Sequence, residues 1–392
     1  MLHSDPMIPD RARPPSRGFS ARGRTARRWR PRGFGALVPP ALLALAAAPL
    51  AGCQTVGYYS QAVGGHLALM RAREPIDELL EDDATDPELR AKLETLLEAR
   101  RFAVEELALP DTDSYRTYVE TGRRYVTWNV VAAPEFSLSA HTWCFPVAGC
   151  VSYRGYYAEE DARAYADEFA EEGFDVAVGG ASAYSTLGWF DDPVLDTMLR
   201  GGELRYVGTL FHEMAHQRFY VQDDSDFNEA YATFVEREGV RRWLASRGQE
   251  ERLPAYEAAL ARGADFAELL AGAREALVAL YGQDLGEAAM RAAKAEAFDA
   301  MRADYEALKA SWDGYAGYDG WFARELNNAR LVAVSTYRRR VPAFAALFEL
   351  EGRDLERFHE AVEALGEMTK AERTARLDEL AAMGERETAS RP

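Results

Sequence analysis

A His-Glu-x-x-His motif constrains this chain more than any other feature of its sequence. The motif lies in the run from Thr209 to Gln217, whose apolar positions have the spacing of an amphipathic helix. In such a helix His212 and His216 are one turn apart on the same face, so both imidazoles can bind one metal ion. Glu213 stands beside them, within reach of a water at that ion. The motif therefore predicts a catalytic zinc site with a third protein ligand from elsewhere and one open position.

The third ligand is expected after the second histidine, and a carboxylate is the expected type because the His-x-x-Gly-x-x-His continuation of the metzincins is absent. Glu229 lies thirteen residues beyond His216, in a segment that begins with capping residues and continues as an amphipathic helix. A carboxylate at this position would complete a His2Glu site, and Asn228-Glu229 resembles the Asn-Glu that carries the ligand in thermolysin-like enzymes. Thr233 replaces the acidic residue that these enzymes carry four positions later. Glu236, on the same helical face, is therefore a candidate partner for the first histidine.

Residues 1–52 are expected to be a cleaved signal peptide. Nine arginines lie in the first 32 residues and an apolar stretch follows, which is the order of charged and apolar regions in such peptides. The stretch ends in Leu50-Ala-Gly-Cys53, which resembles the bacterial lipobox. That resemblance implies that Cys53 is lipidated and begins the mature protein, and Gln54 after it favours the periplasmic face of the outer membrane. A membrane anchor or an ordinary signal peptide with an incidental cysteine is the alternative.

The composition argues against a nucleic-acid partner. The chain has 46 Lys and Arg residues against 64 Asp and Glu residues, a formal net charge of −18. Without residues 1–52, which contain nine arginines and two aspartates, 37 basic and 62 acidic residues remain and the net charge is −25. A chain this acidic repels phosphate backbones. No second apolar run approaches the length of a transmembrane helix, so the lipid is the expected membrane contact.

Cys144 and Cys150 are the other two cysteines of the chain. They lie six residues apart around Pro146 and Gly149, so in an oxidising compartment they could close a small disulfide loop. Free buried thiols are the alternative. Neither cysteine has a histidine or cysteine partner at the spacing of a metal site.

The remaining pattern predicts an α+β fold that is mostly α. Helical periodicity dominates residues 54–110, with one helix starting at Asp86-Pro87. Three stretches rich in β-branched and aromatic residues then predict strands, at 125–131, 151–157 and 174–178. A small sheet therefore precedes the metal helix. The stretch 174–185 is a candidate edge strand for an extended substrate, or an ordinary strand and loop.

From residue 241 onwards the pattern is almost entirely helical. Long helices are expected at 253–280 and 287–312, a further helix at 326–337, and a terminal helical pair from residue 341. These observations divide the chain into a signal peptide, a zincin-like domain with the metal site, and a helical C-terminal region that packs on it. The expected bounds are 1–52, 53–240 and 241–392.

Four further residues are candidates for contacts with the substrate. Asp191 and Asp192 could bind a substrate amine, but capping a helix that starts at Pro193 is the favoured role. Arg330 and Tyr337 could stabilise a tetrahedral oxyanion, and ordinary packing is the favoured alternative.

Several of these motifs together resemble a predicted aminopeptidase family of bacterial lipoproteins. The resemblance covers nearly the whole mature chain and is carried by five runs: 58–62, 149–155, 208–217, 227–239 and 326–330. It implies a gluzincin-like zinc metallopeptidase. It implies metallopeptidase chemistry more directly than exopeptidase specificity.

We therefore expect Zn2+ to be held by His212, His216 and Glu229. Glu213 is the expected general base, taking a proton from a water at the zinc and returning it to the leaving amine of a peptide substrate. The expected reaction is peptide-bond hydrolysis in the bacterial cell envelope.

Three functions are compatible with this chemistry. An aminopeptidase needs a carboxylate for the free α-ammonium group, which Asp191, Asp192 or Glu236 could supply. An envelope metalloendopeptidase would use the same zinc chemistry in an open cleft. A non-enzymatic zinc-binding lipoprotein with an interaction role is a different class, and Glu213 argues against it, because a structural zinc site needs no general base.

Overall fold

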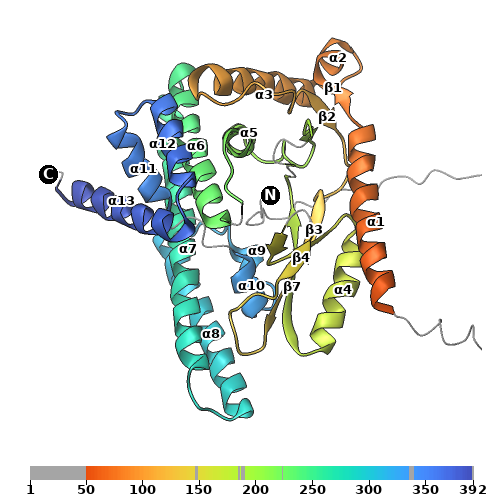
Figure 1. Ribbon diagram of the computed structural model, residues 1–392, viewed down its shortest axis with the longest axis vertical. Helices are drawn as coiled ribbons and strands as arrows, with labels where there is room; N and C mark the ends of the chain where they lie inside the picture. The colour runs from red at the N-terminus through yellow and green to blue at the C-terminus, as the bar shows by residue number, and fades with distance from the viewer. Residues whose placement is uncertain are drawn as a thin grey trace, which may run out of the picture.

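The computed structural model describes residues 50–145, 149–183, 186, 190–222, 224–334 and 340–390, with side chains from 56 to 384. The expected signal peptide lies almost wholly outside this part. The chain is α+β and mostly helical, with small sheets, as the sequence predicts. Figure 1 shows the sheets and α4 (Glu159–Glu171) to one side of the central helices α5 (Glu203–Arg218) and α6 (Ser225–Ser246), with the last three helices of the chain on the other side.

The N-terminal part is helical. α1 (Leu50–Arg71), β1 (Glu74–Pro75) and α2 (Ile76–Glu81) lead into α3 (Pro87–Glu106). The carboxylate of Asp86 accepts hydrogen bonds from the backbone N–H groups of the first turn of α3, at 2.9 and 3.0 Å. This N-cap confirms the helix start that the Asp-Pro pair predicts.

A three-stranded antiparallel sheet follows. β3 (Thr127–Pro134) is the central strand, between β6 (Arg154–Tyr156) and β7 (Phe174–Ala181). Neighbouring residues of β3 pack into different clusters: Val130 packs with α4 (Glu159–Glu171), whereas Val131 and Ala133 pack with Ala329. Because neighbouring strand residues point to opposite faces, helices cover both sides of this sheet. The strands predicted at 125–131 and 174–178 are confirmed as β3 and β7, whereas the stretch 151–157 contains only β6 and the last residue of β5 (Gly149–Val151).

Two smaller sheets complete the β structure. β1 pairs with β2 (Thr117–Val119), which pairs in parallel with β8 (Val194–Leu195). β4 (Trp143–Phe145) and β5 (Gly149–Val151) form a hairpin closed by a disulfide between Cys144 and Cys150, with an S–S distance of 2.03 Å.

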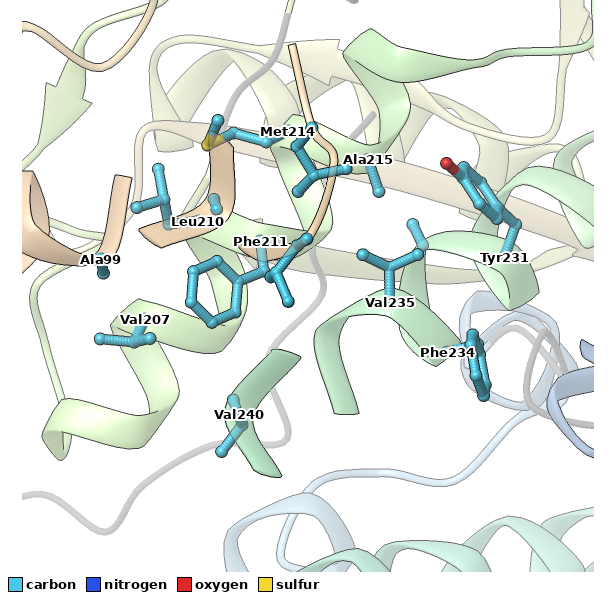
Figure 2. Packing of buried hydrophobic residues seen from close by; sticks show 14 of the residues in the cluster. Ala99, Val207, Leu210, Phe211, Met214, Ala215, Tyr231, Phe234, Val235 and Val240 are labelled. Atoms are coloured by element: carbon cyan, nitrogen blue, oxygen red, sulfur yellow. The ribbon is translucent and has the colours of Figure 1, made fainter. Parts of the chain in front are cut away.

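The helices α5 (Glu203–Arg218) and α6 (Ser225–Ser246) pack against each other in the largest hydrophobic cluster (Figure 2). Glycine allows the contact to be close. A Cβ at Gly239 of α6 would lie 2.7 Å from Cδ2 of Phe211, and one at Gly208 of α5 would lie 3.2 Å from Cγ of Glu236. At each point a side chain of one helix therefore packs directly against the backbone of the other.

The C-terminal region has more helices than the sequence predicts. A short turn, η2 (Glu250–Arg252), precedes the hairpin of α7 (Leu253–Tyr281) and α8 (Glu287–Ser311), and both long helices agree with the prediction. The helix expected at 326–337 is limited to α10 (Asn328–Ala333), because Asn327 caps its start and Val334 is extended. The remaining helices of this region are α9 (Asp319–Phe322), α11 (Val341–Leu350), α12 (Leu355–Gly366) and α13 (Lys370–Ser390).

The last three helices replace the terminal pair that was expected, and they return to the first part of the chain. Residues of α11, α12 and α13 belong to the same hydrophobic cluster as α5 and α6. The expected division between residues 240 and 241 falls inside α6. None of the helices in the described part of the chain is both long and apolar enough to span a membrane.

Candidate metal centre

Three potential metal ligands converge between α5 and α6. The Nε2 atoms of His212 and His216 lie 3.2 Å apart. The carboxylate of Glu229 lies 3.3 Å from Nε2 of His212 and 3.6 Å from Nε2 of His216. Both histidines are buried, and Glu229 is 13% exposed. Among the described residues, these three form the one group of potential metal ligands.

The spacing of these donors fits a tetrahedral metal ion. Bonds of about 2.0 to 2.2 Å at tetrahedral angles place neighbouring ligand atoms roughly 3.3 to 3.6 Å apart. The separations of 3.2, 3.3 and 3.6 Å lie in this range or just below it, and the two distances to Glu229 are to its two different carboxylate oxygens. Two imidazole nitrogens and a carboxylate oxygen are also the donor set that zinc takes in catalytic sites. The residues present therefore fit zinc.

Local sequence accounts for the positions of the histidines and the glutamate. Every residue of α5 from Tyr206 to His216 is buried, so the helix is held on all sides and its i, i+4 histidines have a fixed direction. The return to α6 is held by Asn228, whose side-chain amide donates to the carbonyl of Val221 and accepts from its N–H, at 2.7 and 2.8 Å. Asn228 thus shapes the turn before Glu229.

Glu236 contacts His212 from the other side of the ring. Its Oε2 lies 3.2 Å from Nδ1 of His212. Burial lowers the pKa of His212, but the hydrogen bonds and charges of Glu229 and Glu236 outweigh burial and raise this pKa to about 10. The surroundings of the ring thus favour positive charge, which a metal cation would supply in place of a proton.

Glu213 is buried beside the histidines. Its carboxylate is 2% exposed, and its Oε2 makes no hydrogen bond within the described part of the chain. Burial raises the pKa of Glu213 to about 6. A buried carboxylate oxygen without a hydrogen bond lowers stability, and such groups are concentrated at functional sites.

Asp192 does not cap a helix, contrary to the sequence-based prediction. Residues 194–195 form β8 instead, because they pair in parallel with β2. The Asp192 carboxylate accepts hydrogen bonds from the N–H and the hydroxyl of Thr186, both at 2.8 Å, and it is fully buried. Asp191 is exposed, and its carbonyl accepts a hydrogen bond from Arg73 at 3.2 Å.

Of the remaining candidates, Arg330 makes other contacts, and two lie outside the described part of the chain. The guanidinium of Arg330 donates to the carbonyl of Trp321 at 2.7 Å and lies 4.5 Å from the centre of its ring, and burial lowers the pKa of Arg330 to about 10. These contacts pack Arg330 against Trp321. Tyr337 and the side chain of Cys53 lie outside the described residues.

One contact near the site has no local signal in the sequence. Asp224 occupies the N-cap of α6, but its carboxylate makes no capping hydrogen bond and instead binds Arg373 of α13. The two residues are 149 positions apart. A local reading assigns Asp224 to capping, because only the folded chain brings Arg373 near it.

The comparison with known protein families agrees with peptidase chemistry at this site. A family model with the description "Putative aminopeptidase" matches residues 57–377, which include α5, α6 and most of the C-terminal helices. No curated protein and no solved structure matches the chain. The chain therefore belongs to the family described as "Putative aminopeptidase".

Proposed function

We propose that the protein is a zinc-dependent metallopeptidase of zincin-like fold, acting as an aminopeptidase in the bacterial cell envelope. One observation carries the zinc part of this proposal: Nε2 of His212, Nε2 of His216 and the Glu229 carboxylate lie within 3.6 Å of one another. The family match supports the peptidase part.

When bound by these three residues, zinc would act as a Lewis acid that polarises the peptide carbonyl and lowers the pKa of a water. Glu213 is then the general base. It accepts a proton from the attacking water at Oε2, which makes no hydrogen bond to the described residues, and it donates that proton to the leaving amine. Burial raises the pKa of Glu213 above its ordinary value, which favours its holding the proton until the amine leaves.

Two other groups of the chain orient the site. Glu236 accepts the Nδ1 proton of His212, which leaves Nε2 of that ring as the donor to the metal. Asn228 holds the turn before Glu229 against Val221. These two contacts fix ligands on both helices.

An envelope metalloendopeptidase is the second candidate, and a specific observation favours it. Of the carboxylates that could bind a substrate α-ammonium group, Glu236 is engaged with His212 and Asp192 is engaged with Thr186. Asp191 is exposed. A non-enzymatic zinc protein is disfavoured, because such a site would gain nothing from the buried carboxylate of Glu213.

The envelope location rests on the sequence before and at Cys53, where lipidation is proposed. A cross-link between Cys144 and Cys150 is compatible with it, because disulfides persist in oxidising compartments.

A peptide digestion tests the proposal. The purified protein, loaded with zinc, would be incubated with matched peptide libraries whose N-termini are free or acetylated, and the products identified by mass spectrometry. Stepwise loss of N-terminal residues from the free library alone supports an aminopeptidase, whereas internal cleavage of both libraries supports an endopeptidase. No cleavage of either library, with zinc shown to be bound, would exclude peptidase activity.

A further inference from the structure

We infer that Arg373 is a positioning residue of the metal site: it holds the first turn of α6, and with it Glu229, in register with the two histidines. The inference rests on the proposed zinc site. It adds to that site a residue of α13, far from the motif in sequence.

The guanidinium of Arg373 donates four hydrogen bonds. Its Nε and Nη2 atoms donate to Oδ2 of Asp224 at 2.8 and 2.6 Å. Its Nη1 donates to the carbonyls of Gly366 and Met368 at 3.2 and 2.9 Å, in the segment that joins α12 to α13. The group also lies 5.2 Å from the ring centre of Phe227 in the first turn of α6. Arg373 and Asp224 are each only 3% exposed, so water does not weaken the contact.

The position of Asp224 makes the pair unusual. Aspartate at an N-cap normally accepts a hydrogen bond from the first turn, and losing such a cap costs about 1 kcal/mol. The Asp224 carboxylate accepts no hydrogen bond of this kind. A buried ion pair adds little net stability compared with apolar packing, since both charges must lose their water. The buried pair is better explained by the position that it gives to the start of α6 than by a gain in stability.

The start of α6 determines the position of Glu229. Asp224 directly precedes α6, and Glu229 is in its second turn, so a few residues of rigid helix separate them. Asn228 joins α6 only to the preceding turn, which can move with the helix. Arg373 joins it to α13, which packs on α11 and the main hydrophobic cluster. The arginine therefore adds a directional polar contact, at the start of the Glu229 helix, to the apolar packing that α6 already makes with α5 and α11.

Zinc binding by variants of the full chain tests this inference. Arg373→Met removes the ion pair between Arg373 and Asp224, leaves the exposed Lys370 3.8 Å from Oδ1 of Asp224, and keeps an apolar side chain of similar length. We expect its zinc dissociation constant, measured by competition with a chromogenic chelator, to rise about tenfold. The absorption spectrum of the cobalt-loaded variant should also change, because cobalt reports ligand geometry. Arg373→Lys keeps the charge but not the fork of donors. Its zinc dissociation constant should lie between those of Arg373→Met and the wild type.

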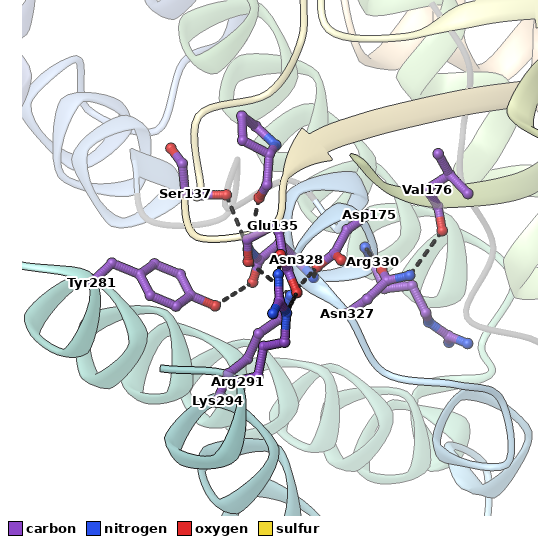
Figure 3. Close-up of polar contacts among 11 residues, drawn as sticks. Glu135, Ser137, Asp175, Val176, Tyr281, Arg291, Lys294, Asn327, Asn328 and Arg330 are labelled. Atoms are coloured by element: carbon purple, nitrogen blue, oxygen red, sulfur yellow. Dashed lines mark hydrogen bonds and ion pairs between the residues drawn. The ribbon is translucent and has the colours of Figure 1, made fainter. Parts of the chain in front are cut away.

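Lys294→Met is the matched control. Lys294 donates to Asp175 at 2.6 Å and joins α8 to β7, with exposed fractions of 12% and 15% for the two side chains (Figure 3). This variant should lose stability in urea and keep the zinc affinity of the wild type.

Zinc affinity of Arg373→Met within twofold of the wild type, or no weaker than that of Lys294→Met, would overturn the inference. If Arg373→Met does not fold, Arg373→Lys decides by the same criterion. Wild-type protein that binds zinc but cleaves no peptide would overturn the proposed activity and leave the role of Arg373 intact.

Discussion

Oε2 of Glu236 lies 3.2 Å from Nδ1 of His212, on the side of the ring away from His216 and Glu229. The contact is possible because Gly208 faces Glu236, where any side chain would press on its Cγ and Oε1 atoms. A partner on the second ring nitrogen fixes the tautomer and direction of a metal-binding histidine.

Glu236→Ala should therefore weaken zinc binding without abolishing it. Loss of such a partner typically costs 10- to 100-fold in metal affinity, and we expect a rise of that size in the zinc dissociation constant. Glu236→Gln should have a smaller effect, because its amide oxygen still accepts the Nδ1 proton. Asp226→Ala, an exposed carboxylate on the same helix, is the control. Equal affinities for the Glu236→Ala variant and the control would refute the role of Glu236.

Glu213→Gln should keep zinc and lose turnover. The amide has nearly the shape of the carboxylate but cannot accept the proton of a water, and loss of a general base costs about 10²- to 10⁴-fold in rate. The measurements are the metal content of the purified variant and kcat on a peptide that the wild type cleaves. Glu287→Gln, an exposed residue at the start of α8, provides the comparison. A variant with wild-type kcat would show that another group takes the proton.

Gly239→Ala should destabilise the pair of helices that carries the site. The added Cβ would lie 2.7 Å from Cδ2 of Phe211 and 2.8 Å from Cδ1 of Leu107, both in the core. Such overpacking costs about 1 to 3 kcal/mol of the free energy of unfolding. Gly272→Ala in α7, where a Cβ meets nothing within 4 Å, should instead stabilise by about 0.5 to 1 kcal/mol, because alanine favours the helix. Urea unfolding of both variants measures the expected loss in the free energy of unfolding for Gly239→Ala and the expected gain for Gly272→Ala.

His359 should make the fold sensitive to acid. Its Nε2 lies 2.9 Å from the carbonyl of Leu107, which can only accept, so Nε2 carries the proton and Nδ1 accepts from the hydroxyl of Tyr231 at 2.8 Å. Burial lowers the pKa of this neutral histidine to about 4, and the charge of Arg218 acts in the same direction. Between pH 6.5 and 4 the unfolded chain therefore binds the extra proton. Stability is lost as the pH falls through this window, by up to about 1.4 kcal/mol per pH unit.

The check is urea unfolding of the wild type and of His359→Gln at several pH values from 7 to 4.5. The variant should be less stable at pH 7, and its free energy of unfolding should fall less steeply on acidification. Parallel curves for the two proteins would mean that another group is responsible for the acid sensitivity.

Sequence reasoning succeeded where a signal is local. The Asp86-Pro87 pair predicts the start of α3, and the apolar spacing around Thr209 predicts the helix α5. The sequence also predicts that the two histidines and Glu229 lie close together. The next helix runs back antiparallel to α5 and brings Glu229 to His216.

Sequence reasoning failed where distant segments determine the local structure. Val194 and Leu195 form a strand only because β2, far earlier in the chain, pairs with them. Asp224 has the residue type of a cap, yet Arg373 takes its carboxylate. In both places a tertiary contact determines the local structure, and a local sequence pattern does not show which distant residue makes that contact.

The disulfide in the hairpin of β4 and β5 has a practical consequence for anyone who prepares this protein. Phe145, beside Cys144, stacks on Tyr58 of α1 with ring centres 5.4 Å apart, so the hairpin supports the first helix of the fold. Two strands of three residues hold together weakly without a cross-link. Material made in a reducing cytosol would carry two thiols there and lack that support. Secretion or oxidative refolding, with a free-thiol assay on each batch, is therefore the route to samples whose activities can be compared.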